Sequence, residues 1–99
     1  MSYPTPETIA ARLSQLHSEE FGGKTMGRYR IDRELFKDLA NRDKLEKVVV
    51  DKVAKALMED HGLILMDLGP YLAVLQAKKA LAWRSATKKI VSTAVEDIQ

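Results

Sequence analysis

Residues 22 to 25, Gly-Gly-Lys-Thr, are of the types found at the end of a phosphate-binding loop. Such a loop holds phosphate oxygens with backbone N–H groups, and its lysine adds a positive charge. The complete motif needs another glycine five residues before Gly23, where this chain has Ser18, and it follows a strand. Because a predicted helix precedes it here, we interpret the match as a coincidence within a basic loop that is able to touch phosphate.

The two histidines, His17 and His61, are candidate metal ligands or acid–base groups. Neither has a partner at the spacing of a metal site, and the side chains of Glu59, Asp60 and His61 diverge around a helix. Nothing in the sequence places a serine, a histidine and an acid together as a nucleophile requires. We therefore expect packing and capping roles for the histidines, and no metal, no cofactor and no enzymatic activity.

The composition is that of one globular domain over residues 1–99. Apolar residues make up 45% and charged residues 30%, and there is no cysteine for a disulfide or a thiolate zinc site. The net charge of +2 is too small to indicate a nucleic-acid binder by itself. The densest basic run, from Lys24 to Arg33, has four cations against one anion, a mixture that is also typical of a solvated surface.

The N-terminal residues show no leader pattern, because neither a basic segment nor an apolar segment follows Met1. The longest apolar stretch, Leu63 to Met66, is far shorter than a membrane span. We expect a cytoplasmic protein that does not enter a membrane.

Local signals predict three elements in the first part of the chain. Thr5 is a good N-cap and Pro6 suits the first helical position, so a helix is expected over residues 6–20. Polar and apolar residues alternate over residues 28–31, which predicts a short strand. Asp32 is then a predicted N-cap for a second, short helix.

A third helix is predicted over residues 45–60, with Gly62 as its stop. At 100° per residue its apolar side gathers Leu45, Val49, Val50, Val53, Ala56 and Leu57. Three consecutive valines cannot all face one core, so we expect Val48 to lie outside. The period then changes: short apolar runs at 63–68 and 71–75 flank Gly69-Pro70, which predicts a β-hairpin.

Residues 77–97 read as one long amphipathic helix. Its apolar side includes Trp83, Ile90 and Val91 and is wider than a single packing contact requires. We expect residues 77–98 to be a dimerisation element that packs in part against a second copy of the chain, giving a homodimer.

The order of these elements over residues 6–76 resembles that of the winged helix-turn-helix superfamily of bacterial regulators. The sequence likeness is carried by residues Leu39 to Val74. Within it, Ala56 to Leu65 is similar to the end of a recognition helix entering the first wing strand. The resemblance implies a mainly helical α+β fold: a winged-helix-like core of three helices, a small β-hairpin and a long C-terminal helix.

The resemblance also implies a small DNA-binding protein, a bacterial transcriptional regulator or a mobile-element accessory protein. The helix 45–60 would enter the major groove of double-stranded DNA, with cations meeting phosphates or guanine edges and Val48 a thymine methyl group. Arg28 and Arg30 would contact the DNA backbone. The implied DNA-binding residues are Arg28, Arg30, Arg42, Lys44, Lys47, Val48, Lys52 and Lys55.

Two features weaken the case for DNA contact, and an alternative is a protein–protein interaction or adaptor module of winged-helix shape without DNA binding, which the near-neutral charge and the acidic first helix also support. The hairpin segment 66–71 has one acid and no basic residue, although DNA-contacting wings often carry Arg or Lys. Asp51 lies between Lys47 and Lys55 at four-residue spacing. It could form two ion pairs, each worth about 0.3–0.5 kcal/mol, on a helix side that only faces water.

Overall fold

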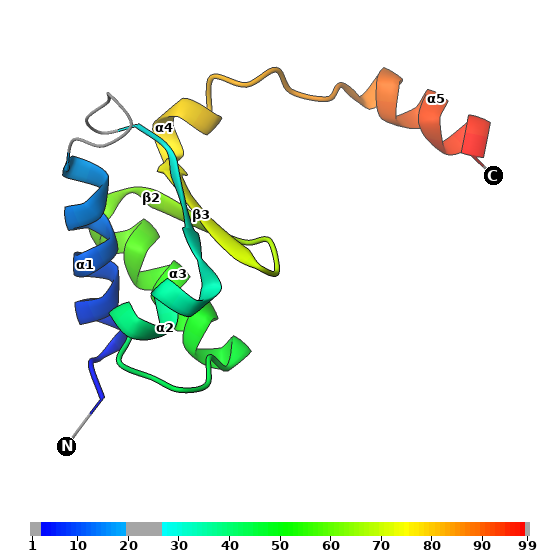
Figure 1. The fold of residues 1–99 in the computed structure, drawn as a ribbon. Helices are drawn as coiled ribbons and strands as arrows, with labels where there is room; N and C mark the ends of the chain where they lie inside the picture. The colour runs from blue at the N-terminus through cyan, green and yellow to red at the C-terminus, as the bar shows by residue number, and fades with distance from the viewer. Residues whose placement is uncertain (1–2, 20–26, 99) are drawn as a thin grey trace.

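The computed structural model describes residues 3–19 and 27–98, which form a mainly helical α+β fold (Figure 1). These residues contain five helices and a three-stranded antiparallel sheet, which confirms the predicted class. In chain order the elements are α1 (Pro6–Ser18), β1 (Tyr29–Asp32), α2 (Arg33–Leu39), α3 (Lys47–His61), β2 (Leu63–Asp67), β3 (Tyr71–Gln76), α4 (Ala77–Ala80) and α5 (Lys88–Ile98). No helix in the described ranges has the length and apolar character needed to cross a membrane.

α1 begins where the local signals place it. The Thr8 N–H donates a hydrogen bond of 3.2 Å to the Thr5 hydroxyl, and Pro6 occupies the first turn, where a missing N–H costs nothing. The helix ends at Ser18, slightly earlier than predicted. The loop segment Gly22–Thr25 lies outside the described residues.

The strands are ordered β1-β3-β2, and both pairings are antiparallel. β1 lies one residue later in the chain than predicted, and its buried residues Tyr29 and Ile31 pair with Val74 and Leu72 of β3. The Tyr29 hydroxyl donates a 2.7 Å hydrogen bond to the Leu13 carbonyl oxygen, which ties the sheet to α1. Desolvation by burial raises the pKa of Tyr29, so the hydroxyl keeps the proton that this bond requires.

The beginnings of α2 and α3 differ in detail from the prediction. Asp32 stands at the N-cap position of α2, but its side chain makes no capping hydrogen bond. α3 begins at Lys47, and Leu45 is buried from the preceding turn instead of from the helix. Gly62 ends α3 at φ 64°, a conformation that glycine adopts without steric cost.

The predicted hairpin is confirmed as β2 and β3. Its turn contains Gly69 at φ 87°, and the Leu68 N–H closes the turn with a 2.8 Å hydrogen bond to the Tyr71 carbonyl oxygen. The hairpin adds two strands to β1, and the buried residues of the sheet form one core with α1, α2 and α3.

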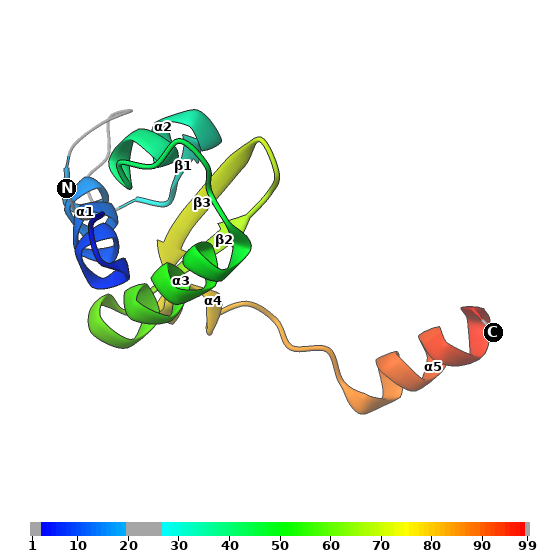
Figure 2. The ribbon, with the colours of Figure 1, turned by 90° about the horizontal axis from the view of Figure 1, so that it is seen from below.

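The prediction of one long helix over residues 77–97 is wrong. α4 ends at Ala80, residues 84–87 have no regular structure, and α5 begins at Lys88 (Figures 1 and 2). The Thr87 hydroxyl accepts a 3.3 Å hydrogen bond from the Ile90 N–H, so this residue starts a new helix instead of continuing the old one. A helix gains most of its stability from packing one side, and Ile90, Val91 and Val95 on the apolar side of α5 are about half exposed or more.

The chain therefore divides into a body, made of α1 to α4, and a C-terminal arm, residues 81–98, which projects away from it (Figure 2). The radius of gyration is 16.4 Å. A compact chain of 100 residues has a radius of gyration of about 13 Å. The larger value of this chain reflects the arm, which extends beyond the body.

Candidate nucleic-acid interface

α3 presents one side to solvent along its length. Its other side, which includes Val49, Val53 and Leu57, is buried in the core and anchors the helix against α1 and β2. The side chains of Lys47, Val48, Asp51, Lys52, Lys55 and Glu59 are exposed. Val48 is 53% exposed, as predicted from the run of three valines, although valine is among the residue types most often buried.

The lysines on the exposed side of α3 keep their charge available. The ion pairs within the described ranges are Arg33–Asp67 and Lys37–Glu34, and Asp51 takes part in neither. The two ion pairs considered for Asp51 with Lys47 and Lys55 are therefore not formed. Four lysines are exposed here, Lys47, Lys52 and Lys55 on the helix and Lys44 in the preceding turn, and the exposed acids Asp51 and Glu59 lie on the same side.

Arg42 does not join this group. Its guanidinium lies over the Tyr3 ring, 4.5 Å from the ring centroid, and the residue is half-buried. Its Nε is shielded from solvent and has no hydrogen-bond partner among the described residues. Arg42 therefore contacts the N-terminal segment, and its guanidinium, which the sequence prediction assigned to DNA, makes a cation–π contact with Tyr3.

Arg28 and Arg30 lie on another surface. Along β1 the buried side chains of Tyr29 and Ile31 face the helices, so Arg30 points to the opposite, outer face of the sheet. There its guanidinium lies 4.6 Å from the centroid of the Tyr71 ring. The two arginines share a groove on this outer face, whereas α3 packs on the inner side of the fold. The predicted DNA-binding set is thus divided among three places.

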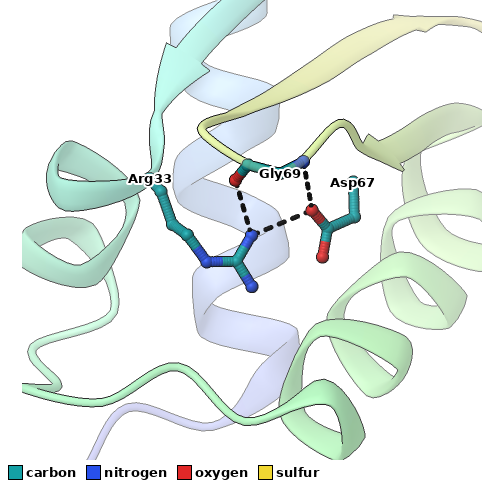
Figure 3. A network of polar contacts seen from close by, with 3 residues as sticks. All are labelled: Arg33, Asp67 and Gly69. Atoms are coloured by element: carbon teal, nitrogen blue, oxygen red, sulfur yellow. Dashed lines mark hydrogen bonds and ion pairs between the residues drawn. The ribbon is translucent and has the colours of Figure 1, made fainter.

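Arg33, at the start of α2, holds the tip of the β2–β3 hairpin (Figure 3). Its Nη1 donates hydrogen bonds of 2.9 Å to Asp67 Oδ1 and to the Gly69 carbonyl oxygen. Asp67 Oδ1 also accepts the Gly69 N–H at 2.9 Å, and the Arg33 N–H donates to the Pro70 carbonyl oxygen at 2.9 Å. We call these four residues the hairpin clamp, because they fix the hairpin tip relative to α2.

The hairpin clamp pairs the one acid of the hairpin with a cation from outside the hairpin. Two hydrogen bonds lower the pKa of Asp67. The bond from Arg33 has the larger effect, and the bond from the Gly69 N–H has the smaller one. The carboxylate is thus matched by a cation from 34 residues earlier in the chain. Sequence reasoning missed Arg33 because no local signal marks so distant a partner. An Asp two residues before a Gly indicates only that the aspartate can bond its own turn.

Both histidines line a cleft of about 800 Å³ at the C-terminal ends of α1 and α3. His17 is buried, and His61 is exposed in the last turn of α3, where a cation is favoured by the helix dipole. No carboxylate is among the described residues that line this cleft, and the described residues hold no cluster of three potential metal ligands.

Comparison of the chain with known protein families, with curated proteins and with solved structures finds no match.

Proposed function

We propose that this chain is a winged helix-turn-helix protein that binds duplex DNA, acting as a bacterial-type transcriptional regulator or as an accessory protein of a mobile element. The observation that carries the proposal is the exposed side of α3, where Lys47, Lys52 and Lys55 lie on the same side as Val48 and form no ion pairs with other described residues. The element order supports it, since a helix, an edge strand, two helices and a hairpin paired to that strand make up a winged-helix core.

The dimensions of α3 suit the major groove. Its 15 residues span about 22 Å, and a groove about 12 Å wide admits one helix. Recognition helices contact base edges mainly with their first turns, which here carry Lys47 and Val48. A lysine can reach guanine O6 and N7 or a phosphate, and the Val48 methyl groups can touch a thymine methyl. Arg28 and Arg30 are left out of this interface because they lie on the outer face of the sheet, and Arg42 is left out because its guanidinium stacks on the Tyr3 ring.

The test is a fluorescence-anisotropy titration of duplex DNA at two salt concentrations. The double variant K47E/K55E should weaken binding at least tenfold and reduce the salt dependence by about two phosphate contacts. The variant K78E/K79E is the matched control, because it makes the same charge change at exposed positions of α4. Equal affinities for K47E/K55E and the wild type would exclude α3 as the binding surface.

A second function, a protein-interaction module without DNA binding, is favoured by one observation. Trp83 is 60% exposed and lies in a groove beside the apolar side chains of Met66 and Leu75. Large exposed aromatic groups are typical of protein interfaces. A wild-type chain that binds no duplex at about 50 mM salt, where phosphate contacts are strong, would favour this function over DNA binding.

We also propose that the chain is a homodimer through its C-terminal arm, which includes Trp83, Ile90 and Val91. These three side chains are between 49% and 62% exposed. A two-fold dimer would present two copies of α3 to half-sites about one turn of the DNA helix apart.

A further inference from the structure

The outer face of the sheet carries a groove of about 460 Å³, which we call the sheet groove. Its side walls and floor are mainly apolar, and they come from the sheet and from the start of the arm. The residues that line it are Arg28, Tyr29, Arg30, Met66, Ala73, Val74, Leu75 and Trp83. The charged residues among them are two arginines, and none of these described lining residues is acidic. The sheet groove therefore suits an apolar segment with a negative end.

α5 is a segment of this kind. Its side chains Ile90, Val91 and Val95 are about half exposed or more, although they share one side of the helix. Its acidic residues, Glu96 and Asp97, are both in the last turn, where the helix dipole also leaves a negative end. An isolated helix of 11 residues is marginal in water, and these charges weaken it further, so α5 needs a partner.

We propose that α5 of one copy lies in the sheet groove of a second copy, and that the two copies exchange arms reciprocally. This inference rests on the homodimer proposed above and identifies the surface that receives the arm. The apolar side of α5 covers Met66, Ala73 and Leu75. Its acidic end lies toward Arg28 and Arg30, so the charges complement each other. Trp83 of the receiving copy closes one wall of the groove.

The shape of the chain favours a second copy over the chain's own arm as the occupant. Trp83 already lies in the sheet groove, and beyond it the chain leads α5 away from the body (Figure 2). The molecule measures 55 × 31 × 23 Å, so the arm reaches well beyond the body. To enter its own groove, α5 would have to reverse direction within residues 84–87.

The contact area favours exchange over direct pairing of two α5 helices. Each α5 offers Ile90, Val91, Ala94 and Val95, which bury on the order of 100 Å² apiece. Two such helices would bury about 800 Å², less than the roughly 1,000 Å² of a specific interface. Reciprocal exchange buries the same α5 side chains and adds the sheet groove of each copy, so it buries more area than direct pairing of two arms.

The experiment measures mass by sedimentation at several protein concentrations and compares four single variants. M66E alters the sheet groove, and L68E is its control, because Leu68 is exposed on the hairpin outside the groove. V91E alters the apolar side of α5, and S92E is its control on the polar side. We expect a dimer for the wild type and both controls, with dissociation constants raised at least tenfold for M66E and V91E.

Mixing M66E with V91E tests reciprocity. The groove of the V91E chain and the arm of the M66E chain are both intact, so the mixture should regain part of the dimer mass, which neither variant shows alone. The sole tryptophan gives a second signal, because covering Trp83 should shift its fluorescence to shorter wavelength as the concentration rises.

Several results would overturn the exchange. A wild type that stays monomeric at every concentration excludes the dimer. If the fluorescence of Trp83 in that monomer lies at short wavelength, the chain's own arm is the occupant of the sheet groove. Dimeric M66E beside monomeric V91E identifies pairing between arms, and dimers of both variants place the interface elsewhere. DNA binding is judged separately: K47E/K55E should keep the wild-type mass, so failure of the DNA proposal leaves this result intact.

Discussion

α3 and α5 are both amphipathic helices, but the apolar side of α3 is buried and that of α5 is exposed. The apolar side of α3 is buried against α1 and β2, whereas Ile90 on α5 is 62% exposed. The two helices follow the same periodicity and obey the same local rules. The comparison shows that periodicity specifies which side of a helix is apolar, but not whether the same chain supplies the surface that covers it.

The largest expected difference between the two helices is in core packing. Leu57→Ala in α3 should lower the free energy of unfolding by about 2–5 kcal/mol, because Leu57 is fully buried and its loss leaves a cavity. Val91→Ala in α5 should change it by less than about 0.5 kcal/mol at concentrations where the chain is monomeric. Urea unfolding followed by circular dichroism measures both. Equal losses would mean that the arm packs against its own body.

A smaller difference is expected at the helix N-caps. Thr5→Ala should cost about 1 kcal/mol, because Thr5 caps α1, a helix that belongs to the core. Thr87→Ala removes the corresponding bond at the start of α5 and should reduce helical circular dichroism without moving the unfolding midpoint of the body. A shifted midpoint for Thr87→Ala would show that α5 unfolds together with the body.

The smallest effect on the free energy of unfolding is expected at the hairpin clamp, which attaches the hairpin tip to α2. Asp67 has a lowered pKa in the folded protein, so it stabilises the fold above its unfolded pKa of about 3.9. That contribution is lost as the pH falls through the lowered folded pKa. Asp67→Asn should cost up to about 1 kcal/mol at pH 7, because the pair is partly exposed.

The measurement compares the free energy of unfolding of the wild type with that of Asp67→Asn as the pH changes. Urea unfolding of the wild type and of Asp67→Asn at a series of pH values should show a gap that is present at neutral pH and shrinks below about pH 4. Glu34→Gln is the matched control, since it removes the surface ion pair with Lys37 outside the hairpin clamp. A gap for Asp67→Asn that does not change with pH would contradict a charge-based role for Asp67.

Most elements of the body could be predicted from the sequence because their signals are local. Thr5 and Pro6 begin α1, and Gly62 and Gly69 mark the end of α3 and the hairpin turn. The break in the C-terminal helix could not be predicted in this way. It depends on whether the folded chain covers the apolar side of α5, which is a property of the tertiary structure.

The candidate site shows the same limit. Helical periodicity alone placed Lys47, Val48 and Lys55 on the exposed side of α3. It could not place Arg30 or Arg42, because their positions depend on which face of the sheet is covered and on the contact between Arg42 and Tyr3. The hairpin clamp joins residues more than 30 positions apart and has no sequence signal of its own.

The irregular segment between α4 and α5 has a consequence for how the chain is processed. Residues 84–87 are exposed and begin with Arg84, a residue after which trypsin cleaves. Exposed segments without regular structure are the preferred sites of proteolytic nicking. A single cut at this position would separate α5 from the elements of the body while leaving the core residues in place. One proteolytic event at this position would therefore release α5, while Trp83 and the exposed side of α3 stay with the body.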